Sequence, residues 1–394
     1  MKQLKNIIVF LFWGSVLVSF YAVSSSEIKY TVSTFFEIQD TSKVKQLDTL
    51  QTVLNAFNKI ALKNDTLVEK RLKTQDSLEI LKNALINIDQ QSDLLRQELK
   101  CEEVDSCINI LRRKLDLLKK RRDELNHLSI SLKRVLSLQD KESDNLGKKL
   151  EIHVNEVQQN AALVYGSRKV FYKGSWYFIF VVNTDSSRIL MHHKDSLTKK
   201  PYNTIGNVYK ALAKNNIKPL MITNAGMYTT SFEPQGLFIE NSKELFPVDI
   251  GKPNSNNFYL KPNGVFFIDN DNKPFINTTE DFISKYRSKK IKVKFATQSG
   301  PMLLIGGKIH PAFQINSYNK KIRSGVGVVN NNKVVFIMSI DDVNFYDFAR
   351  LFNVLFNCKD ALFLDGAISR MYLYDLAPLE KGGNFGPIIS VSKF

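Results

Sequence analysis

Proline and glycine are missing from a long part of this 394-residue sequence. All eleven prolines lie at or after Pro201, and no glycine occurs between Gly14 and Gly147. These residues are the strongest markers of turns, so their absence over 132 residues argues against hairpins and sheets in that stretch. Cysteine is also rare, and three cysteines cannot staple a chain of this length into a disulfide-rich scaffold. The sequence therefore predicts a composite chain.

Negative charge is in short supply as well. The chain has 55 Lys and Arg residues and 39 Asp and Glu residues. From Gln159 onward it has 30 Lys and Arg residues and 17 Asp and Glu residues. The resulting charge of +13 in the second part favours an anionic ligand or surface over a neutral one. A nucleic-acid ligand is the weaker interpretation of this charge, because the N-terminal residues, described next, have the pattern of an export signal. We therefore expect no nucleic-acid partner.

The N-terminal residues have the pattern of an export or anchoring segment. Lys2 and Lys5 precede an apolar run over residues 7–23 that only Gly14, Ser15 and Ser19 interrupt. This run is intermediate in length between a signal-peptide core and a membrane span, so cleavage and membrane anchoring both stay open. We expect residues 1–26 to be a signal peptide or an N-terminal membrane anchor. The remainder is then periplasmic, membrane-anchored or secreted.

Residues 41–158 have the apolar spacing of a coiled coil. Leucines recur at alternating steps of three and four, as in Leu47, Leu50, Leu54 and Phe57. The spacing loses phase around residues 64–66 and again around residues 100–106, where Cys101 and Cys107 flank a predicted turn. Two arms of about 55 residues at 1.5 Å per residue predict an antiparallel helical hairpin roughly 80 Å long. We assign this hairpin no chemistry and expect a spacer, a docking arm for a protein partner, or a means of self-association.

The two cysteines at the turn suggest a further covalent feature. In an oxidising compartment Cys101 and Cys107 are expected to close an intramolecular disulfide across the hairpin tip. Reduced thiols or intermolecular pairing are the alternatives.

Residues 161–394 have a different composition, with short apolar runs separated by glycine and proline. Strands are predicted at 170–182 (two strands), 219–223, 236–239, 265–269, 291–296, 325–329, 334–339 and 361–364. Helices are predicted at 205–215, 279–285 and 345–356. Many strands with few interspersed helices indicate an α+β domain, and the regular alternation of a doubly wound sheet is absent.

Several common catalytic signatures are absent from this domain. The sequence has no Gly-x-Ser-x-Gly, no phosphate-binding Gly-Lys-Ser/Thr loop and no His-Glu-x-x-His, and its five histidines are scattered. A Ser-His-Asp triad or a histidine-based metal site is therefore disfavoured. We expect no metal and no cofactor.

Six short polar segments that carry glycine stand at predicted strand ends instead. They are Asn-Ala-Gly-Met-Tyr (224–228), Glu-Pro-Gln-Gly-Leu (233–237), Asn-Phe-Tyr-Leu-Lys-Pro-Asn-Gly-Val (257–265), Thr-Gln-Ser-Gly-Pro-Met (297–302), Ile-Arg-Ser-Gly-Val-Gly (322–327) and Leu-Asp-Gly-Ala-Ile-Ser-Arg-Met-Tyr (364–372). In this order they resemble the phosphodiester glycosidase domain family, and more closely its bacterial, exopolysaccharide-related branch. The wider family has Gly-Gly-Ser where this chain has Ala367-Ile368-Ser369, which points to a different substrate or a weakened site. The resemblance implies an exported hydrolase of sugar-1-phosphodiester or related anionic polysaccharide linkages.

Three residues are the predicted catalytic groups. Asp365 follows the apolar run 361–364, so it emerges from a buried strand into a turn, where a carboxylate can stabilise an oxocarbenium ion. Arg323 can clamp a phosphodiester through two parallel hydrogen bonds. Glu233 is a candidate second carboxylate, with Asp341 and Asp342 as alternatives.

The remaining candidates are expected to bind the glycan or sugar-phosphodiester substrate through amide, hydroxyl and guanidinium groups or through close backbone approach. They are Asn224, Gly226, Gln298, Ser299, Gly366, Ser369 and Arg370. Tyr228 is one of several aromatic residues suited to stacking against a sugar. The alternative to an enzyme is a non-catalytic envelope protein, in which this domain binds glycan and the hairpin docks a partner.

Overall fold

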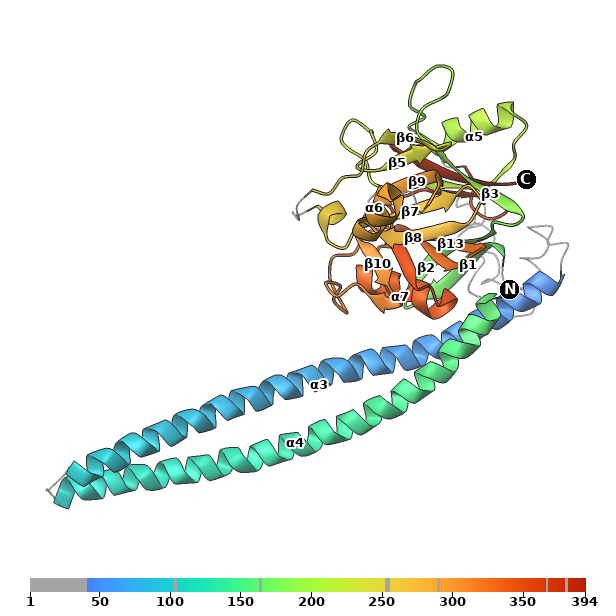
Figure 1. Ribbon diagram of the computed structural model, residues 1–394. Coiled ribbons are helices and arrows are strands. Elements are labelled where there is room, and N and C mark those ends of the chain that lie inside the picture. Colours follow the sequence, from blue (N-terminus) through green and yellow to red (C-terminus); the bar gives the residue numbers. More distant parts are fainter. Residues whose placement is uncertain are drawn as a thin grey trace, which may run out of the picture. The chain divides into compact units, whose positions relative to one another are not determined.

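The computed structural model describes residues 41–101, 105–162, 165–251, 256–288, 291–365, 368–379 and 382–394 (Figure 1). The chain divides into two compact units, residues 1–49 and 50–394, and the second contains everything described below apart from the first turns of one helix. The predicted signal or anchor, residues 1–26, lies outside the described residues. Across the described ranges, no helix combines the length and apolarity that crossing a bilayer requires.

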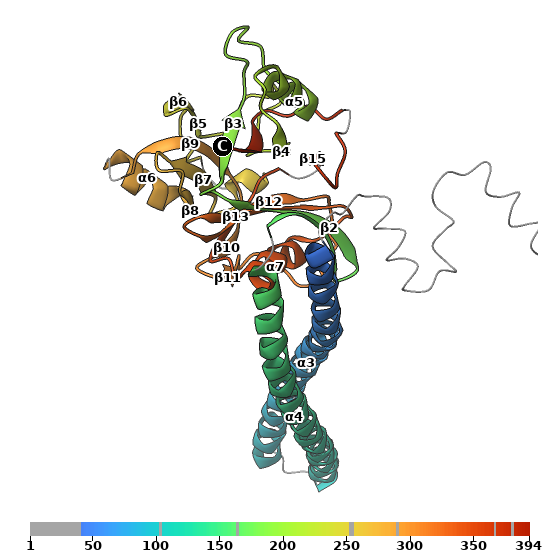
Figure 2. The ribbon, with the colours of Figure 1, turned by 90° about the vertical axis from the view of Figure 1, so that its right-hand side faces the viewer.

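Two long antiparallel helices form the predicted hairpin (Figures 1 and 2). Helix α3 spans Thr41–Cys101 and helix α4 spans Asp105–Ala162. Leu81, Ile88 and Leu125 are buried between them, and ion pairs Arg71–Asp140 (2.5 Å) and Arg122–Asp89 (3.0 Å) join the two helices. The side chains of Cys101 and Cys107 lie outside the described set, so their disulfide stays a prediction.

The loss of phase near residues 64–66 has a structural reason. Helix α3 runs through this point without a break, but its apolar partners change there. Leu54, Phe57 and Ala61 belong to the core of the globular domain, whereas Leu81 and Ile88 pack against α4. The apolar face of the helix therefore shifts where its packing changes from the domain to the other arm.

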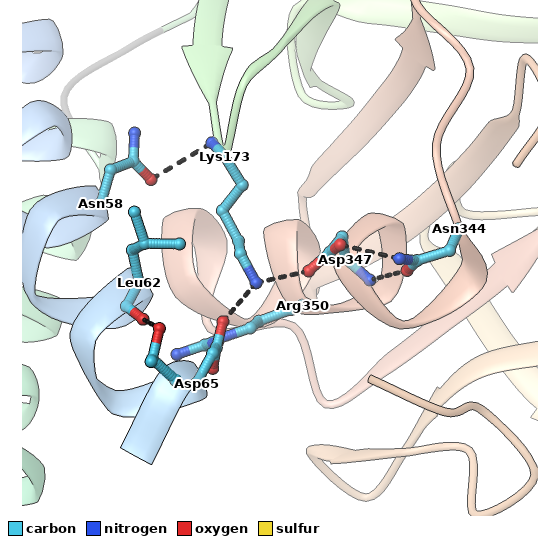
Figure 3. A network of polar contacts seen from close by, with 8 residues as sticks. Asn58, Leu62, Asp65, Lys173, Asn344, Asp347 and Arg350 are labelled. Carbon is cyan, nitrogen blue, oxygen red and sulfur yellow. Dashed lines mark hydrogen bonds and ion pairs between the residues drawn. The ribbon is translucent and has the colours of Figure 1, made fainter. Parts of the chain in front are cut away.

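A buried ionic network stands at this transition (Figure 3). Lys173, in the turn after the first strand of the domain, donates to Asp65 of α3 at 2.6 Å and to Asp347 at 2.7 Å. Arg350 lies 3.3 Å from the second oxygen of Asp65. The exposed fractions of these four side chains are 8–19%. Two carboxylates and two cations thus neutralise each other at the base of the hairpin.

The globular domain has three antiparallel sheets, as an α+β domain rich in strands predicts. The seven-stranded sheet has the order β1 (Gly166–Tyr172), β2 (Ser175–Asn183), β13 (Lys333–Ser339), β12 (Ser324–Asn330), β14 (Asp360–Phe363), β10 (Met302–Ile305) and β11 (Lys308–Ile309). The four-stranded sheet has the order β15 (Met371–Leu373), β4 (Pro219–Asn224), β16 (Ile388–Lys393) and β3 (Ser187–His192). The five-stranded sheet has the order β6 (Lys243–Phe246), β5 (Phe238–Glu240), β9 (Val293–Ser299), β7 (Gly264–Asp269) and β8 (Pro274–Thr278).

The seven-stranded sheet is the central layer, with a separate core on each face. One core joins it to helix α7 (Phe345–Phe356) and to the bases of α3 and α4, through residues such as Ile337, Phe352 and Val157. The other core, which includes Phe336, Phe266 and Ile389, joins it to the other two sheets. The helices α5 (Ile205–Lys214) and α6 (Thr279–Arg287) cover the four-stranded and five-stranded sheets respectively.

Side-chain caps define where these helices begin. Thr204, Thr278 and Asn344 each accept a hydrogen bond from a backbone N–H in the first turn of α5, α6 and α7. Helix α7 has the bounds that the apolar spacing predicts. Strands β3, β6, β8, β10, β11, β15 and β16 were not among the predicted elements.

Candidate functional site

Four strand ends from the three sheets meet at one place in the domain. Asn224 ends β4, Ser299 ends β9, Ser324 begins β12 and Asp365 follows β14. The antiparallel pairing of β12 with β14 sets Ser324 beside Leu364, whose N–H donates to the Ser324 carbonyl at 3.0 Å. The side chains of Asn224, Ser299 and Ser324 are at most 1% exposed. Polar groups from all three sheets are therefore gathered in the interior.

Buried hydroxyls hold the backbone around Asp365. Ser324 Oγ donates to the Asp365 carbonyl at 2.7 Å and accepts from Asn224 Nδ2 at 2.9 Å. Ser369 Oγ lies 2.6 Å from the same carbonyl and 3.0 Å from Ser324 Oγ. Ser299 Oγ donates to the Leu364 carbonyl at 2.6 Å. The backbone of Asp365 is fixed by these contacts.

The other end of this turn is held in the same way. The Arg370 N–H donates to Asn224 Oδ1 at 3.2 Å, and Thr223 Oγ1 donates to the Arg370 carbonyl at 2.9 Å. One terminal nitrogen of the Arg370 guanidinium donates to the Ser369 carbonyl at 3.0 Å. Asp365 and Arg370 are only partly buried, unlike the groups that hold them. The predicted binding residue Gly366 lies outside the described residues.

Tyr228 adds a phenol next to the carboxylate. Burial raises the pKa of Tyr228, and the charge and hydrogen bonding of Asp365 raise this pKa further. The hydroxyl also donates to the Asn384 carbonyl at 2.7 Å. The sequence predicts this ring as a candidate for stacking against a sugar, and its position beside the Asp365 carboxylate is a feature that the sequence does not indicate.

Five of the predicted residues are thus brought together: Asn224, Ser299, Asp365, Ser369 and Arg370. Ser324 belongs with them and was missed, although it lies in one of the six polar segments. The sequence pointed to its neighbour Arg323 instead.

Arg323 is not part of this cluster. Its side chain is 2% exposed, and its guanidinium lies 3.5 Å from the ring centroid of Phe345 at the start of α7. Nε donates to the Val343 carbonyl at 2.8 Å, and a terminal nitrogen donates to the Asn319 carbonyl at 2.9 Å. Burial lowers its pKa to about 10. Because side chains alternate along a strand, Arg323 and Ser324 face opposite sides of the sheet.

Gln298, a predicted substrate-binding residue, makes hydrogen bonds within the protein instead. Its Oε1 accepts from the N–H groups of Leu237 and Asp249, both at 2.9 Å. Its Nε2 donates to the Asp249 carbonyl at 2.7 Å and to Thr279 Oγ1 at 3.2 Å. An amide has two donor hydrogens and two acceptor positions, so no capacity is left for a substrate. Gln298 joins β5, β9 and α6.

Gly226 allows two sheets to approach each other. Its N–H donates to Thr297 Oγ1 at 3.1 Å, and a Cβ at this position would lie 2.3 Å from the Gln298 carbonyl oxygen. No larger residue fits there without moving the backbone of β9. The structure therefore gives Gly226 a packing role beside the cluster.

Glu233 lies in the loop that also carries Tyr228. Its carboxylate is 2.9 Å from Lys194 Nζ and 3.3 Å from Nε2 of the buried His193. Burial lowers the pKa of His193, and Glu233 partly offsets this effect. Asp341, an alternative second carboxylate, accepts a hydrogen bond from the Trp176 N–H at 2.7 Å, next to the turn between β1 and β2.

Within the described ranges, no three His, Cys, Asp or Glu side chains are grouped so as to hold a metal ion.

The chain is similar to several known proteins. The model of the phosphodiester glycosidase family matches residues 218–388, which contain all six polar segments. The uncharacterised protein YigE of Escherichia coli (strain K12) is 33% identical over 196 residues, which cover 49% of this chain and 73% of YigE. The catalytic domain of zebrafish N-acetylglucosamine-1-phosphodiester α-N-acetylglucosaminidase, auto-inhibited by its pro-peptide, aligns with a TM-score of 0.40 and 14% identity over 58% of this chain and 82% of that chain.

Proposed function

Because the chain belongs to the phosphodiester glycosidase family, we propose that it is an exported glycosidase that hydrolyses sugar-1-phosphodiester or related anionic polysaccharide linkages. The observation that carries this proposal is the turn between β14 and β15. Buried hydroxyl and amide groups fix both of its ends, while Asp365 and Arg370 stay partly exposed. A carboxylate and a guanidinium are thus presented from two positions whose backbones are held by buried groups.

These two groups suit the charges that develop during the reaction. The bond between the anomeric carbon and the phosphate oxygen breaks, and the phosphate leaves with the electron pair as a monoester. Water supplies a hydroxyl to the anomeric carbon, and its remaining proton goes to the phosphate or the solvent. Asp365 would stabilise the oxocarbenium ion, and Arg370 would bind the departing phosphate. A phosphate needs little protonation to leave, so a site without a histidine acid suffices.

Phosphate recognition is assigned here to Arg370 rather than to Arg323. The Arg323 guanidinium is buried against Phe345 and bonded to two backbone carbonyls. Arg370 is partly exposed and lies in the same turn as Asp365. The Tyr228 phenol lies beside the Asp365 carboxylate and would orient it by turning its one hydroxyl hydrogen from the Asn384 carbonyl to Asp365.

An assay of the purified protein tests the proposal. Glycosyl phosphodiesters that differ in sugar and in the second ester group are incubated with the protein, and the released sugar is quantified. We expect release from at least one α- or β-linked sugar phosphodiester and much less from the corresponding neutral alkyl glycoside. If no sugar is released from any of them and glycan is still bound, the domain is a binding module.

One observation favours that second candidate, a non-catalytic envelope protein with a partner-docking hairpin. Several large apolar side chains of the hairpin are exposed by about half or more: Leu62, Leu72, Ile80 and Leu94 on α3, and Ile110, Leu117 and Leu138 on α4. Where such exposed apolar residues form a contiguous patch, they suit a surface that binds another protein. We propose that the hairpin docks a partner or a second copy, whether or not the domain is an enzyme.

A further inference from the structure

A cavity lies at one end of the four-stranded sheet, where α5 has ended and β4 begins. Its volume is about 380 Å³. Its lining includes Arg188, Asn216, Lys218, Leu220, Tyr374 and Lys393. These residues come from β3, the connection after α5, the start of β4, the segment after β15, and β16. None of them belongs to the cluster around Asp365.

The cavity concentrates positive charge. Arg188, Lys218 and Lys393 all line it, and no Asp or Glu side chain does. Among the residues that the structure describes, none of the three cations forms an ion pair with a carboxylate; the pairs of this domain join other residues, such as Lys194–Glu233 and Lys273–Asp185. Three cations around one concavity, with no acidic side chain in the lining and at most the main-chain carboxylate of the lining residue Phe394 against them, leave an excess of positive charge that attracts an anion.

Two of the cations are held in place by neighbouring side chains. Arg188 Nε donates to Ser392 Oγ at 3.1 Å across the β3–β16 pair, and its guanidinium makes no other hydrogen bond to the described part of the chain. Lys218 Nζ lies 4.4 Å from the ring centroid of Tyr374. Tyr374 itself is 52% exposed, so part of its ring remains available to a ligand.

The cavity and the Asp365 cluster lie at opposite ends of the same strands. Leu220 is near the start of β4 and Asn224 ends it, which separates them by about 13 Å at 3.3 Å per residue. On the neighbouring strand β15, Arg370 directly precedes the strand and Tyr374 directly follows it. A ligand in the cavity is therefore distinct from a group bound at Asp365.

We propose that this cavity is a second binding site, which takes an oxyanion-bearing saccharide. The terminal nitrogens of Arg188 would bind the oxyanion in a bidentate manner, Lys218 and Lys393 would add charge, and the exposed part of Tyr374 would contact the sugar ring. A phosphate and a carboxylate share this chemistry. The site does not depend on the glycosidase activity of the Asp365 cluster.

Isothermal titration of the full-length protein at constant ionic strength tests this site. The probes are inorganic phosphate, glucose 1-phosphate and glucuronate, which separate a bare phosphate, a sugar phosphate and a sugar carboxylate. We expect a sugar-bearing probe to bind more tightly than inorganic phosphate. Arg188→Gln should weaken this binding at least tenfold, because it removes a charge-assisted bidentate contact.

Three further variants control this result. Lys308→Gln removes an exposed lysine outside both sites, and Arg370→Gln removes the guanidinium of the Asp365 cluster; neither should change the binding to the cavity. Lys218→Gln should weaken binding severalfold, and it provides a second test if Arg188→Gln unfolds at a lower temperature than the wild type.

Three outcomes would overturn the proposal. One is that wild-type protein binds none of the probes at millimolar concentration. Another is that Arg188→Gln, Lys218→Gln and Lys308→Gln have equal effects, because binding is then due to net charge alone. The third is loss of binding in Arg370→Gln with retention in Arg188→Gln, which would locate the anion at the Asp365 cluster.

Discussion

Arg323 and Ser324 are adjacent in sequence, but they serve opposite faces of the seven-stranded sheet. Arg323 stacks on Phe345 beneath the sheet, and Ser324 holds the Asp365 carbonyl on the other side. Which of the two reaches the site depends on the pairing of β12 with β14. This register is a tertiary property, so the sequence could point to the segment 322–327 but not to which of its residues lies in the cluster around Asp365. Asp365 was predictable because a carboxylate directly after a buried strand is exposed at its end.

The first prediction concerns Asp365. Asp365→Asn keeps the shape of the side chain but removes the charge that stabilises the oxocarbenium ion. We expect kcat for a glycosyl phosphodiester to fall by about 10²–10⁴-fold, with the unfolding temperature almost unchanged. Asp271→Asn, in the exposed turn between β7 and β8, serves as the control. Equal turnover in the two variants would remove Asp365 from the mechanism.

The second prediction compares the two arginines. Arg323→Lys loses the planar stack on Phe345 and the contacts to the Val343 and Asn319 carbonyls, so we expect a loss of about 1–3 kcal/mol in the free energy of unfolding. Its activity per folded molecule should stay near the wild type. Arg370→Lys should lower kcat/KM for phosphodiesters more than it lowers stability. Denaturant titration and turnover on the same preparations measure both effects, and the reverse pattern would restore Arg323 as the phosphate ligand.

The third prediction concerns the pH dependence of stability. Burial raises the pKa of Glu240, near the end of β5, from its ordinary value near 4.5 to about 7. Since the folded state favours the protonated form, the contribution of Glu240 to stability is fully present below pH 4.5 and is lost as the pH rises through 7. Glu240→Gln should therefore unfold at a higher temperature than the wild type at pH 8 and at a similar temperature at pH 4.5. The exposed Glu142→Gln serves as the control, and a stability difference for Glu240→Gln that is the same at both pH values would contradict this prediction.

At the scale of elements, helix α3 shows how one helix can serve two cores. Its periodic leucines predict a long helix correctly, but they do not reveal that the first turns of its packed face belong to the globular domain. The shift near Asp65 was visible in the sequence as a loss of phase. Its cause was not, because Lys173, Asp347 and Arg350 lie far along the chain. Strands β3 and β16 escaped prediction because each is only six residues long and neither Ser-Arg-Ile-Leu-Met-His nor Ile-Ile-Ser-Val-Ser-Lys alternates regularly between polar and apolar residues.

The ionic network at this point is the subject of the fourth prediction. Asp65→Asn leaves Lys173 with one carboxylate instead of two and leaves Arg350 without its ion pair to Asp65. Removing one partner from a buried charged network is strongly destabilising, and we expect a loss of about 2–3 kcal/mol in the free energy of unfolding. Denaturant titration measures it, with the exposed Asp76→Asn of the same helix as control. An equal effect of the two variants would show that the network contributes no stability.

At the scale of the whole chain, the hairpin divides into a part that completes the domain and a part that does not. Leu54, Phe57 and Val157 share a core with the seven-stranded sheet and α7. Leu81, Ile88 and Leu125 form a separate cluster between the two helices. Composition and periodicity predict that a helical arm is followed by an α+β domain, with a boundary near residue 160. They do not predict that the bases of both helices pack into the core of that domain.

The fifth prediction follows from this division. Replacing residues 75–138 by a short glycine-rich turn keeps the Arg71–Asp140 pair and the helix bases, so we expect the free energy of unfolding of the domain to change by less than about 1 kcal/mol. Turnover of small substrates should be unchanged. Phe57→Ala, at a fully buried position, should instead cost about 3–5 kcal/mol. Unfolding of the shortened chain at a much lower temperature would show that the distal hairpin stabilises the domain.

The contact between Asp65 and Arg350 also constrains the order in which the protein can be completed during synthesis. The two residues are 285 positions apart, and Phe57 shares its core with residues of α7. In the four-stranded sheet, β16 is inserted between β4 and β3, so this sheet stays incomplete until residue 393 has been made. The base of α3, with Leu54, Phe57 and Ala61, therefore emerges from the ribosome long before the domain residues that cover it have been made, whereas the distal part of α3 can already pack against α4. We expect this base to stay uncovered until late in translation, and the domain to become resistant to protease only after β16 has been made.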